Sequence, residues 1–183
     1  MKISETVTLI AGSFLVVWLG YGFIFESNIE QPNYDIVKKS KDYEIRFYPK
    51  LRLITSPMSN QSNTFQSLFR YIDGQNQTKT KISMTAPVIE YQETMSFVFP
   101  SSIDNPPKAM NNSLEINTIP GLKVAVKKFS GSTKNHQRMV DHFRKELINN
   151  GINVSQTYYL AQYNSPWVFP LLRKNEIWIE VNE

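Results

Sequence analysis

The chain has 183 residues, a formal net charge of +4 and no cysteine. Without cysteine it cannot form disulfides, thiolate nucleophiles, cysteine-based zinc sites or the covalent attachment of c-type haem. The mild positive charge suits an anionic ligand or a membrane surface. We find no basic tract, zinc-ligand spacing or glycine-rich phosphate loop, so no nucleic-acid partner is expected.

The first 25 residues predict a membrane anchor. The 19 residues from Val7 to Phe25 carry no charge, and a helix needs about 20 such residues to cross the hydrocarbon core. A cleaved signal peptide has a shorter apolar region with small residues before the cleavage site, whereas this segment runs directly into Glu26. We therefore expect an uncleaved anchor at 1–25, with its transmembrane part at about 7–25. Lys2 favours an inside N-terminus, which would place the folded domain, residues 26–183, on the non-cytoplasmic side.

The first half of this domain predicts strands and one helix. Alternating apolar residues indicate a hairpin, and we expect Pro49 to end its second strand before another extended run begins. Phe65, Leu68, Phe69 and Ile72 recur at helical spacing, with Asn63 or Thr64 as the expected cap and Gly74 as the stop. The expected strands are Tyr34–Lys39, Tyr43–Tyr48, Leu51–Thr55, Pro87–Tyr91 and Met95–Phe99.

The second half repeats this order of elements. Met139, Val140, Phe143 and Leu147 form the apolar stripe of a helix over about 134–149. The expected strands are Leu122–Lys127, Thr157–Tyr163 and Glu176–Val181. Each half therefore reads strand–helix–strand–strand, which predicts an α+β fold with two helices packed on one curved antiparallel sheet.

Four stretches together resemble the SOUL haem-binding protein family, in the same order over residues 32–182. They are Tyr34-Asp35-Ile36-Val37 with Tyr43-Glu44-Ile45-Arg46, Phe69-Arg70-Tyr71-Ile72-Asp73-Gly74-Gln75-Asn76, Lys81-Ile82-Ser83-Met84-Thr85-Ala86-Pro87-Val88, and Pro166-Trp167 with Pro170 to Trp178. The resemblance implies duplicated halves that form a distorted, barrel-like antiparallel sheet with two helices, related to bacterial effector-binding domains. It also implies non-covalent binding of haem or another tetrapyrrole in a surface groove, without a catalytic centre.

Four residues are candidates for contact with such a ligand, and the resemblance itself assigns no ligand role to a histidine. Arg70 occupies the position expected to reach a haem propionate, and the neighbouring rings of Phe69 and Tyr71 are candidates for contact with the macrocycle. His136 projects near the apolar stripe of the second helix and is the candidate axial metal ligand. Each has a plainer interpretation: a solvated charge for Arg70, core packing for the aromatics and a hydrogen-bonded, partly buried side chain for His136. Met84 is a second candidate, as a thioether ligand of the iron, although a packing role is favoured for it.

The leading hypothesis is a membrane-tethered module that binds haem or a related tetrapyrrole as a carrier, buffer or sensor, with the lipid bilayer as its other partner. The alternative is an effector-binding domain of the same fold that binds small amphiphiles and not haem. The sequence shows no Ser/His/Asp spacing, paired carboxylates in an apolar context or metal-ligand cluster, so we do not expect an enzyme.

Overall fold

The computed structural model describes residues 29–164 and 168–182. The predicted anchor at 7–25 lies outside these residues, and within them no helix is both long and apolar enough to cross a bilayer. The described elements, in chain order, are β1 (Asp35–Lys39), β2 (Glu44–Pro57), α2 (Gln61–Ile72), β3 (Val88–Tyr91), β4 (Thr94–Val98), β5 (Glu115–Ser130), α3 (His136–Asn149), β6 (Val154–Gln162), the 3-10 turn η1 (Pro170–Leu172) and β7 (Lys174–Val181).

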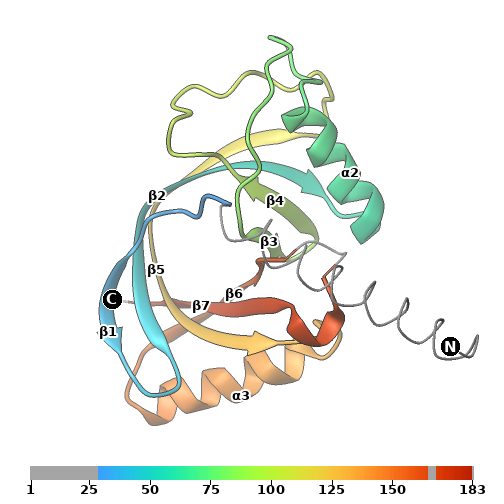
Figure 1. Cartoon of the computed structure of the whole chain (residues 1–183). Helices are drawn as coiled ribbons and strands as arrows, with labels where there is room; N and C mark the ends of the chain where they lie inside the picture. The colour runs from blue at the N-terminus through green and yellow to red at the C-terminus, as the bar shows by residue number, and fades with distance from the viewer. Residues whose placement is uncertain (1–28, 165–167, 183) are drawn as a thin grey trace, which may run out of the picture.

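Six antiparallel strands close into a barrel. Neighbouring strands follow the order β2-β4-β3-β6-β7-β5, and β5 pairs back onto β2 to complete the ring. The short strand β1 adds to the first residues of β2 at the rim, and the two helices lie on different sides of the barrel (Figure 1). The predicted α+β barrel with two helices is therefore confirmed.

The order strand–helix–strand–strand occurs twice, as β2-α2-β3-β4 and β5-α3-β6-β7. Within each unit the last strand pairs with the two other strands, and the units join through the β2–β5 and β3–β6 pairs. Each helix thus covers the outer face of its own unit, although α2 buries only Leu68 and Ile72 of its predicted stripe and leaves Phe69 exposed.

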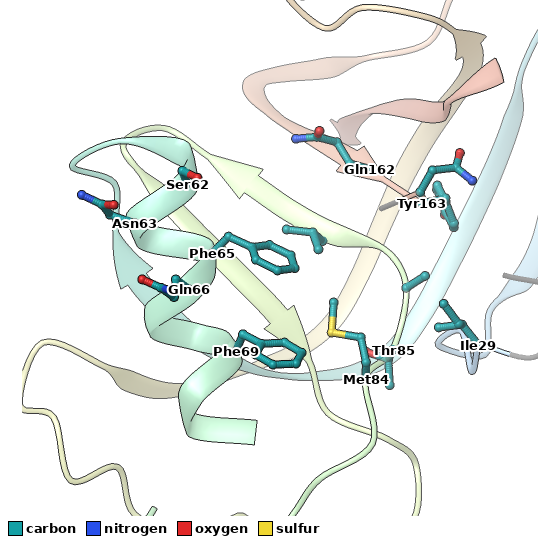
Figure 2. A pocket seen from close by; sticks show the side chains of 13 residues that line it. Ile29, Ser62, Asn63, Phe65, Gln66, Phe69, Met84, Thr85, Gln162 and Tyr163 are labelled. Atoms are coloured by element: carbon teal, nitrogen blue, oxygen red, sulfur yellow. The ribbon is translucent and has the colours of Figure 1, made fainter. Parts of the chain in front are cut away.

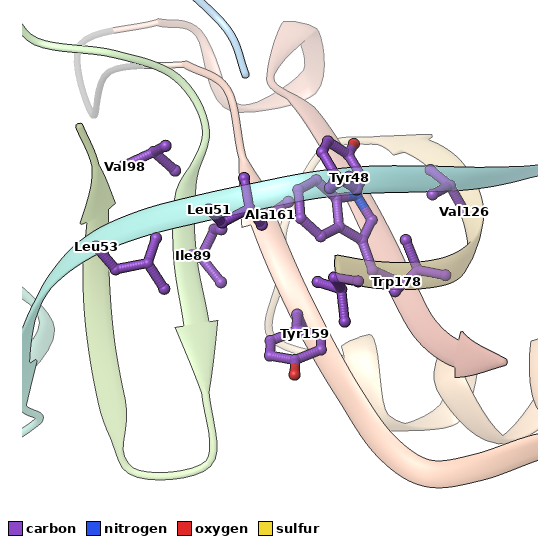
Figure 3. Packing of buried hydrophobic residues seen from close by; sticks show 11 residues of the cluster. Tyr48, Leu51, Leu53, Ile89, Val98, Val126, Tyr159, Ala161 and Trp178 are labelled. Carbon is purple, nitrogen blue, oxygen red and sulfur yellow. The ribbon is translucent and has the colours of Figure 1, made fainter. Parts of the chain in front are cut away.

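Alternation along the strands separates the barrel interior from the helix-covered faces. On β7, Trp178 points into the barrel, while Ile177 and Ile179 pack under α3. The interior is filled by side chains from all six barrel strands, with Tyr48 stacked on Trp178 at a ring separation of 4.8 Å (Figure 3). The barrel is therefore a packed core and not an open channel.

Several predicted boundaries are wrong, and three of them have a clear structural cause. β2 continues through Pro49 instead of ending there, because its pairing with β5 passes from Tyr48–Leu122 directly to Lys50–Pro120. β5 correspondingly begins at Glu115, well before Leu122. Between these two pairs Gly121 has a φ of +70°, which glycine adopts without strain. α2 begins at Gln61, because the side chain of Asn60 accepts the Asn63 amide at 2.8 Å.

Candidate functional site

A groove of about 620 Å³ lies between α2 and the end of β6 (Figure 2). Its volume is in the range typical of small-molecule sites. Four separate parts of the chain line it, namely the first described residue, α2, the segment before β3 with the start of β3, and the end of β6. The lining residues are Ile29, Ser62, Asn63, Phe65, Gln66, Phe69, Met84, Thr85, Ala86, Val88, Gln162, Tyr163 and Asn164.

α2 supplies the aromatic wall. Leu68 and Tyr71 are buried against the barrel, which turns the neighbouring face, with Phe65 and Phe69, toward the groove (Figure 2). The two phenyl rings are 13° from parallel with centroids 6.3 Å apart, and Phe65 also meets the edge of Phe97 at 5.1 Å. Phe65 is therefore fixed by packing, while Phe69 is 46% exposed and presents its ring to a ligand.

The segment before β3 forms the floor. Thr85 is buried, and its hydroxyl donates to the Val98 carbonyl at 2.5 Å. The Ala86 amide donates to the Glu30 carbonyl at 2.9 Å, which ties the first described residues to the same place. Met84, just before these fixed residues, is half-buried, and its side chain extends into the groove (Figure 2).

The groove has a polar rim without charge. Ser62, Asn63, Gln66, Gln162 and Asn164 contribute hydroxyl and carboxamide groups, and none of the described lining residues is charged. The carboxamide of Gln162 is oriented by donating to Glu90 at 2.6 Å. This rim offers hydrogen bonds to a polar ligand edge but no ion pair.

Tyr163 connects the groove to a buried ionic network. Its hydroxyl donates to the Glu176 carboxylate at 2.6 Å, as does the indole of Trp178 at 2.8 Å. Arg46 donates to both oxygens of this carboxylate at 3.1 Å and to Glu44 at 2.7 Å. Burial first, and the charge of Glu176 second, raise the pKa of the Tyr163 hydroxyl far above its usual range. The Tyr163 hydroxyl therefore stays protonated and donates its hydrogen bond to Glu176.

The guanidinium of Arg46 is 1% exposed and stays charged. Burial alone would lower its pKa, but the adjacent Glu176 carboxylate and further hydrogen bonds raise it above the ordinary value. The ring of Tyr34 covers it at 4.2 Å. A second, smaller pocket of about 370 Å³ opens beside this network and shares Tyr163 with the groove.

Residues 29–180 match the family described as "SOUL heme-binding protein". The chain belongs to this family. Its SOUL domain is 31% identical over 163 residues to human "Heme-binding protein 2", covering 77% of this chain and 79% of that protein. The mouse protein of the same name is 28% identical over 182 residues, covering 85% of this chain and 88% of its own length.

Solved structures share the fold of the SOUL domain at low sequence identity. The crystal structure of the EcmrR C-terminal domain superposes with a TM-score of 0.59 at 11% identity, covering 82% of this chain and 98% of that one. A hydrolase from Listeria innocua gives a TM-score of 0.57 at 12% identity, covering 80% of this chain and 94% of that one. At such identity these similarities establish the architecture and nothing about activity.

The three predicted site residues on α2 of the SOUL domain point to different places. Phe69 lines the groove. Tyr71 is 1% exposed and its hydroxyl donates to the Pro107 carbonyl at 2.6 Å, while burial raises its pKa to about 12. Arg70 is exposed in the last helical turn and is not part of the groove lining. A propionate contact from Arg70 stays a prediction.

His136 lies at the start of α3, outside the groove lining. Its Nδ1 is 2.7 Å from the Thr133 carbonyl oxygen, to which it must donate, and its Nε2 is 3.3 Å from the Tyr158 hydroxyl. Both ring nitrogens thus have protein partners, which favours the plainer interpretation of a hydrogen-bonded, partly buried histidine. Axial ligation by His136 stays a prediction.

Several groove residues were missed from sequence, among them Phe65, Gln162 and Tyr163. Phe65 was assigned only to the helix stripe, and because it lies near the centre of that stripe no local signal indicated that it also lines a groove. No sequence signal brings the end of β6 to α2, because the β3–β6 pairing that does so joins the two halves of the barrel.

Proposed function

We propose that the protein binds haem or a related tetrapyrrole non-covalently in the groove between α2 and the end of β6. The observation that carries the proposal is the apolar wall of this groove, formed by Phe65, Phe69, Met84 and Val88, in a chain of the SOUL heme-binding family. A tetrapyrrole offers a flat apolar face to such a wall. The relatives named "Heme-binding protein 2" support the same ligand class.

The residues present fit the two chemical parts of such a ligand. The macrocycle would lie against the phenyl rings, which supply dispersion and stacking contacts. The propionates would lie at the rim, where Asn63 and Gln66 offer amide donors, with Arg70 one turn from Gln66 on the helix. Because the rim carries no cation among its described residues, binding would depend mainly on the apolar contact and only weakly on salt.

We further propose that residues 7–25 anchor this module in a membrane, with the domain on the non-cytoplasmic side. The support is the 19-residue uncharged segment. A hydrophobic ligand that partitions into bilayers suits a carrier, buffer or sensor held there, and we propose no catalytic step.

Titration with haemin tests the binding proposal. The full chain in lipid nanodiscs, with empty nanodiscs as the blank, should give a saturable one-to-one shift of the haem absorption band. Phe69→Ala should weaken binding about threefold to tenfold, since an aromatic contact contributes about 0.5–1.5 kcal/mol beyond its area. Ile148→Ala, an exposed apolar residue on α3, is the matched control and should bind as wild type does.

Two further variants locate the predicted polar and metal contacts. Arg70→Ala should weaken haemin binding by less than about fivefold, because an exposed charge contributes at most about 1 kcal/mol. A changed haem spectrum in His136→Ala would place the iron near α3 and would contradict the groove. Only unsaturable drift of the wild-type spectrum would contradict haem binding altogether.

The second candidate function is binding of small amphiphiles other than haem. The absence of any charged side chain among the described groove-lining residues favours it, because a dianionic ligand gains no ion pair there. A thermal-shift screen distinguishes the two, since a ligand that binds only the native state stabilises it by an amount that grows with the ratio of its concentration to its dissociation constant. Stabilisation by uncharged amphiphiles, with none by haemin, would favour this second function.

A further inference from the structure

Most of the described side chains that are able to ligate haem iron do not line the groove. Haem proteins use histidine, cysteine, methionine or tyrosine as axial ligands. The chain has no cysteine and two histidines, and both of these, His136 and His142, lie on α3 and not among the groove-lining residues.

Two ligand types remain at the groove itself, Tyr163 and Met84. Tyrosine ligates iron as a phenolate, but the Tyr163 hydroxyl donates to the Glu176 carboxylate at 2.6 Å. Glu176 is a strong acceptor that Arg46 holds in place, so loss of the Tyr163 proton would set two negative charges against each other. Its raised pKa agrees with this geometry.

Met84 has the opposite properties. It carries no proton to lose, is half-buried beside the fixed Thr85, and lies between the phenyl wall of α2 on one side and Ile29 and Tyr163 on the other (Figure 2). A macrocycle lying against Phe65 or Phe69 would therefore share the groove with the Met84 thioether. The polar groups of the described lining residues are all uncharged: the hydroxyls of Ser62, Thr85 and Tyr163 and the carboxamides of the rim.

We propose that Met84 is the axial ligand of haem iron in this groove. The proposal rests on the proposed haem binding and deepens it. The sulfur donates an electron pair to the iron, and no proton is released. Since a thioether is a soft ligand, it binds ferrous iron better than ferric iron and raises the reduction potential.

The test separates the contribution of the iron to binding from the contribution of the macrocycle. The full chain in nanodiscs is titrated with haemin, with dithionite-reduced haem and with metal-free protoporphyrin IX, as wild type and as Met84→Leu. Leucine preserves the apolar volume of methionine but has no ligand atom. Met58→Leu is the matched control, because Met58 is also half-buried and packs against the same core cluster as Met84 but does not line the groove.

Met84→Leu should weaken binding of reduced haem by about tenfold or more, convert its spectrum to that of a haem without the sulfur ligand and lower the reduction potential. Its affinity for protoporphyrin IX should stay within about twofold of wild type, since the area buried is nearly the same. Met58→Leu should match wild type throughout. Met84→His should restore axial ligation with a histidine-type spectrum.

Unchanged haem spectra and potential in Met84→Leu, with saturable binding of both ligands, would overturn the Met84 proposal and leave the groove proposal standing. Equal losses for haem and protoporphyrin IX would likewise overturn it, because they would show a packing role. Failure of wild type to bind either ligand saturably would overturn the proposed function and the Met84 ligand together.

Discussion

At the scale of single residues, the carboxylate of Glu176 holds together one end of the barrel interior. It accepts hydrogen bonds from Arg46, Tyr163 and Trp178, and it is 6% exposed. Three donors from three places in the sequence therefore depend on one acceptor. Removing this carboxylate leaves Arg46 with Glu44 as its remaining acidic partner and takes the charged acceptor from the buried donors of Tyr163 and Trp178.

Glu176→Gln should therefore lower the free energy of unfolding by about 3 kcal/mol, the usual cost of breaking one side of a buried ion pair. Urea denaturation followed by circular dichroism measures it. Asp104→Asn is the matched control: it removes the exposed partner of Arg52, an ion pair whose carboxylate is 83% exposed, and it should change the stability little. Equal effects of the two substitutions would show that the network contributes no more than a surface pair.

The neighbouring Glu44 makes the stability of the barrel depend on pH. A hydrogen bond from Arg46 is the main reason that the pKa of Glu44 lies below its ordinary value of 4.5, and burial opposes it. Because the folded-state pKa is the lower one, the stabilisation is present above pH 4.5 and is lost as the pH falls through the folded-state value.

Denaturation midpoints measured between about pH 6 and pH 3 should therefore fall with acidity in wild type and fall less in Glu44→Gln, which has no carboxyl group to protonate. Wild type and Glu44→Gln should differ most above pH 4.5 and converge in acid. Parallel curves would assign the acid sensitivity to other carboxylates.

At the scale of elements, both helices could be predicted from the sequence. The long strands β2 and β5 were predicted to exist, but their lengths were not. The apolar stripes of α2 and α3 identify both helices, because helical periodicity is a local property of the sequence. The length of β2 and β5 is set by their mutual pairing, which overrides the local signals of Pro49 and Pro120. The first residues of β5, from Glu115 to Gly121, are mostly exposed and so carry no clear alternation.

In the candidate site, too, the residues within local patterns were predicted and those brought in by long-range pairing were not. Phe69 was predicted on its own helix and lies in the groove, and Met84 was noted within a local motif. The opposite wall, with Gln162 and Tyr163, follows from the β3–β6 pairing between the two halves. Tyr71 was predicted to contact the ligand, but it is buried, and its hydroxyl donates to the Pro107 carbonyl of a loop. A helical wheel does not show such a loop. Positions one residue apart on a helix face different surroundings.

At the scale of the whole molecule, the chain enters the fold at the groove. Ile29 lines the groove, and Glu30 pairs with Thr85 on its floor. Three residues, 26–28, separate Ile29 from the end of the predicted anchor at Phe25. Even a fully extended chain spans no more than about 14 Å over that interval. If residues 7–25 cross a bilayer, the groove must therefore lie close to its surface, whereas the β1–β2 turn lies beside α3 and is not bound by this limit (Figure 1).

This arrangement predicts unequal access of lipid to the two ends of the molecule. Because the chain has no cysteine, Gln66→Cys in the groove and Asp42→Cys in the exposed β1–β2 turn each allow labelling with a fluorophore at one position. In vesicles carrying nitroxide headgroups, the label at position 66 should be quenched more strongly than the label at position 42, since nitroxide quenching requires near contact. Vesicles without nitroxide control for changes in polarity. Strong quenching at 42 with little at 66 would place the groove away from the bilayer, and a ligand would then have to reach it through water.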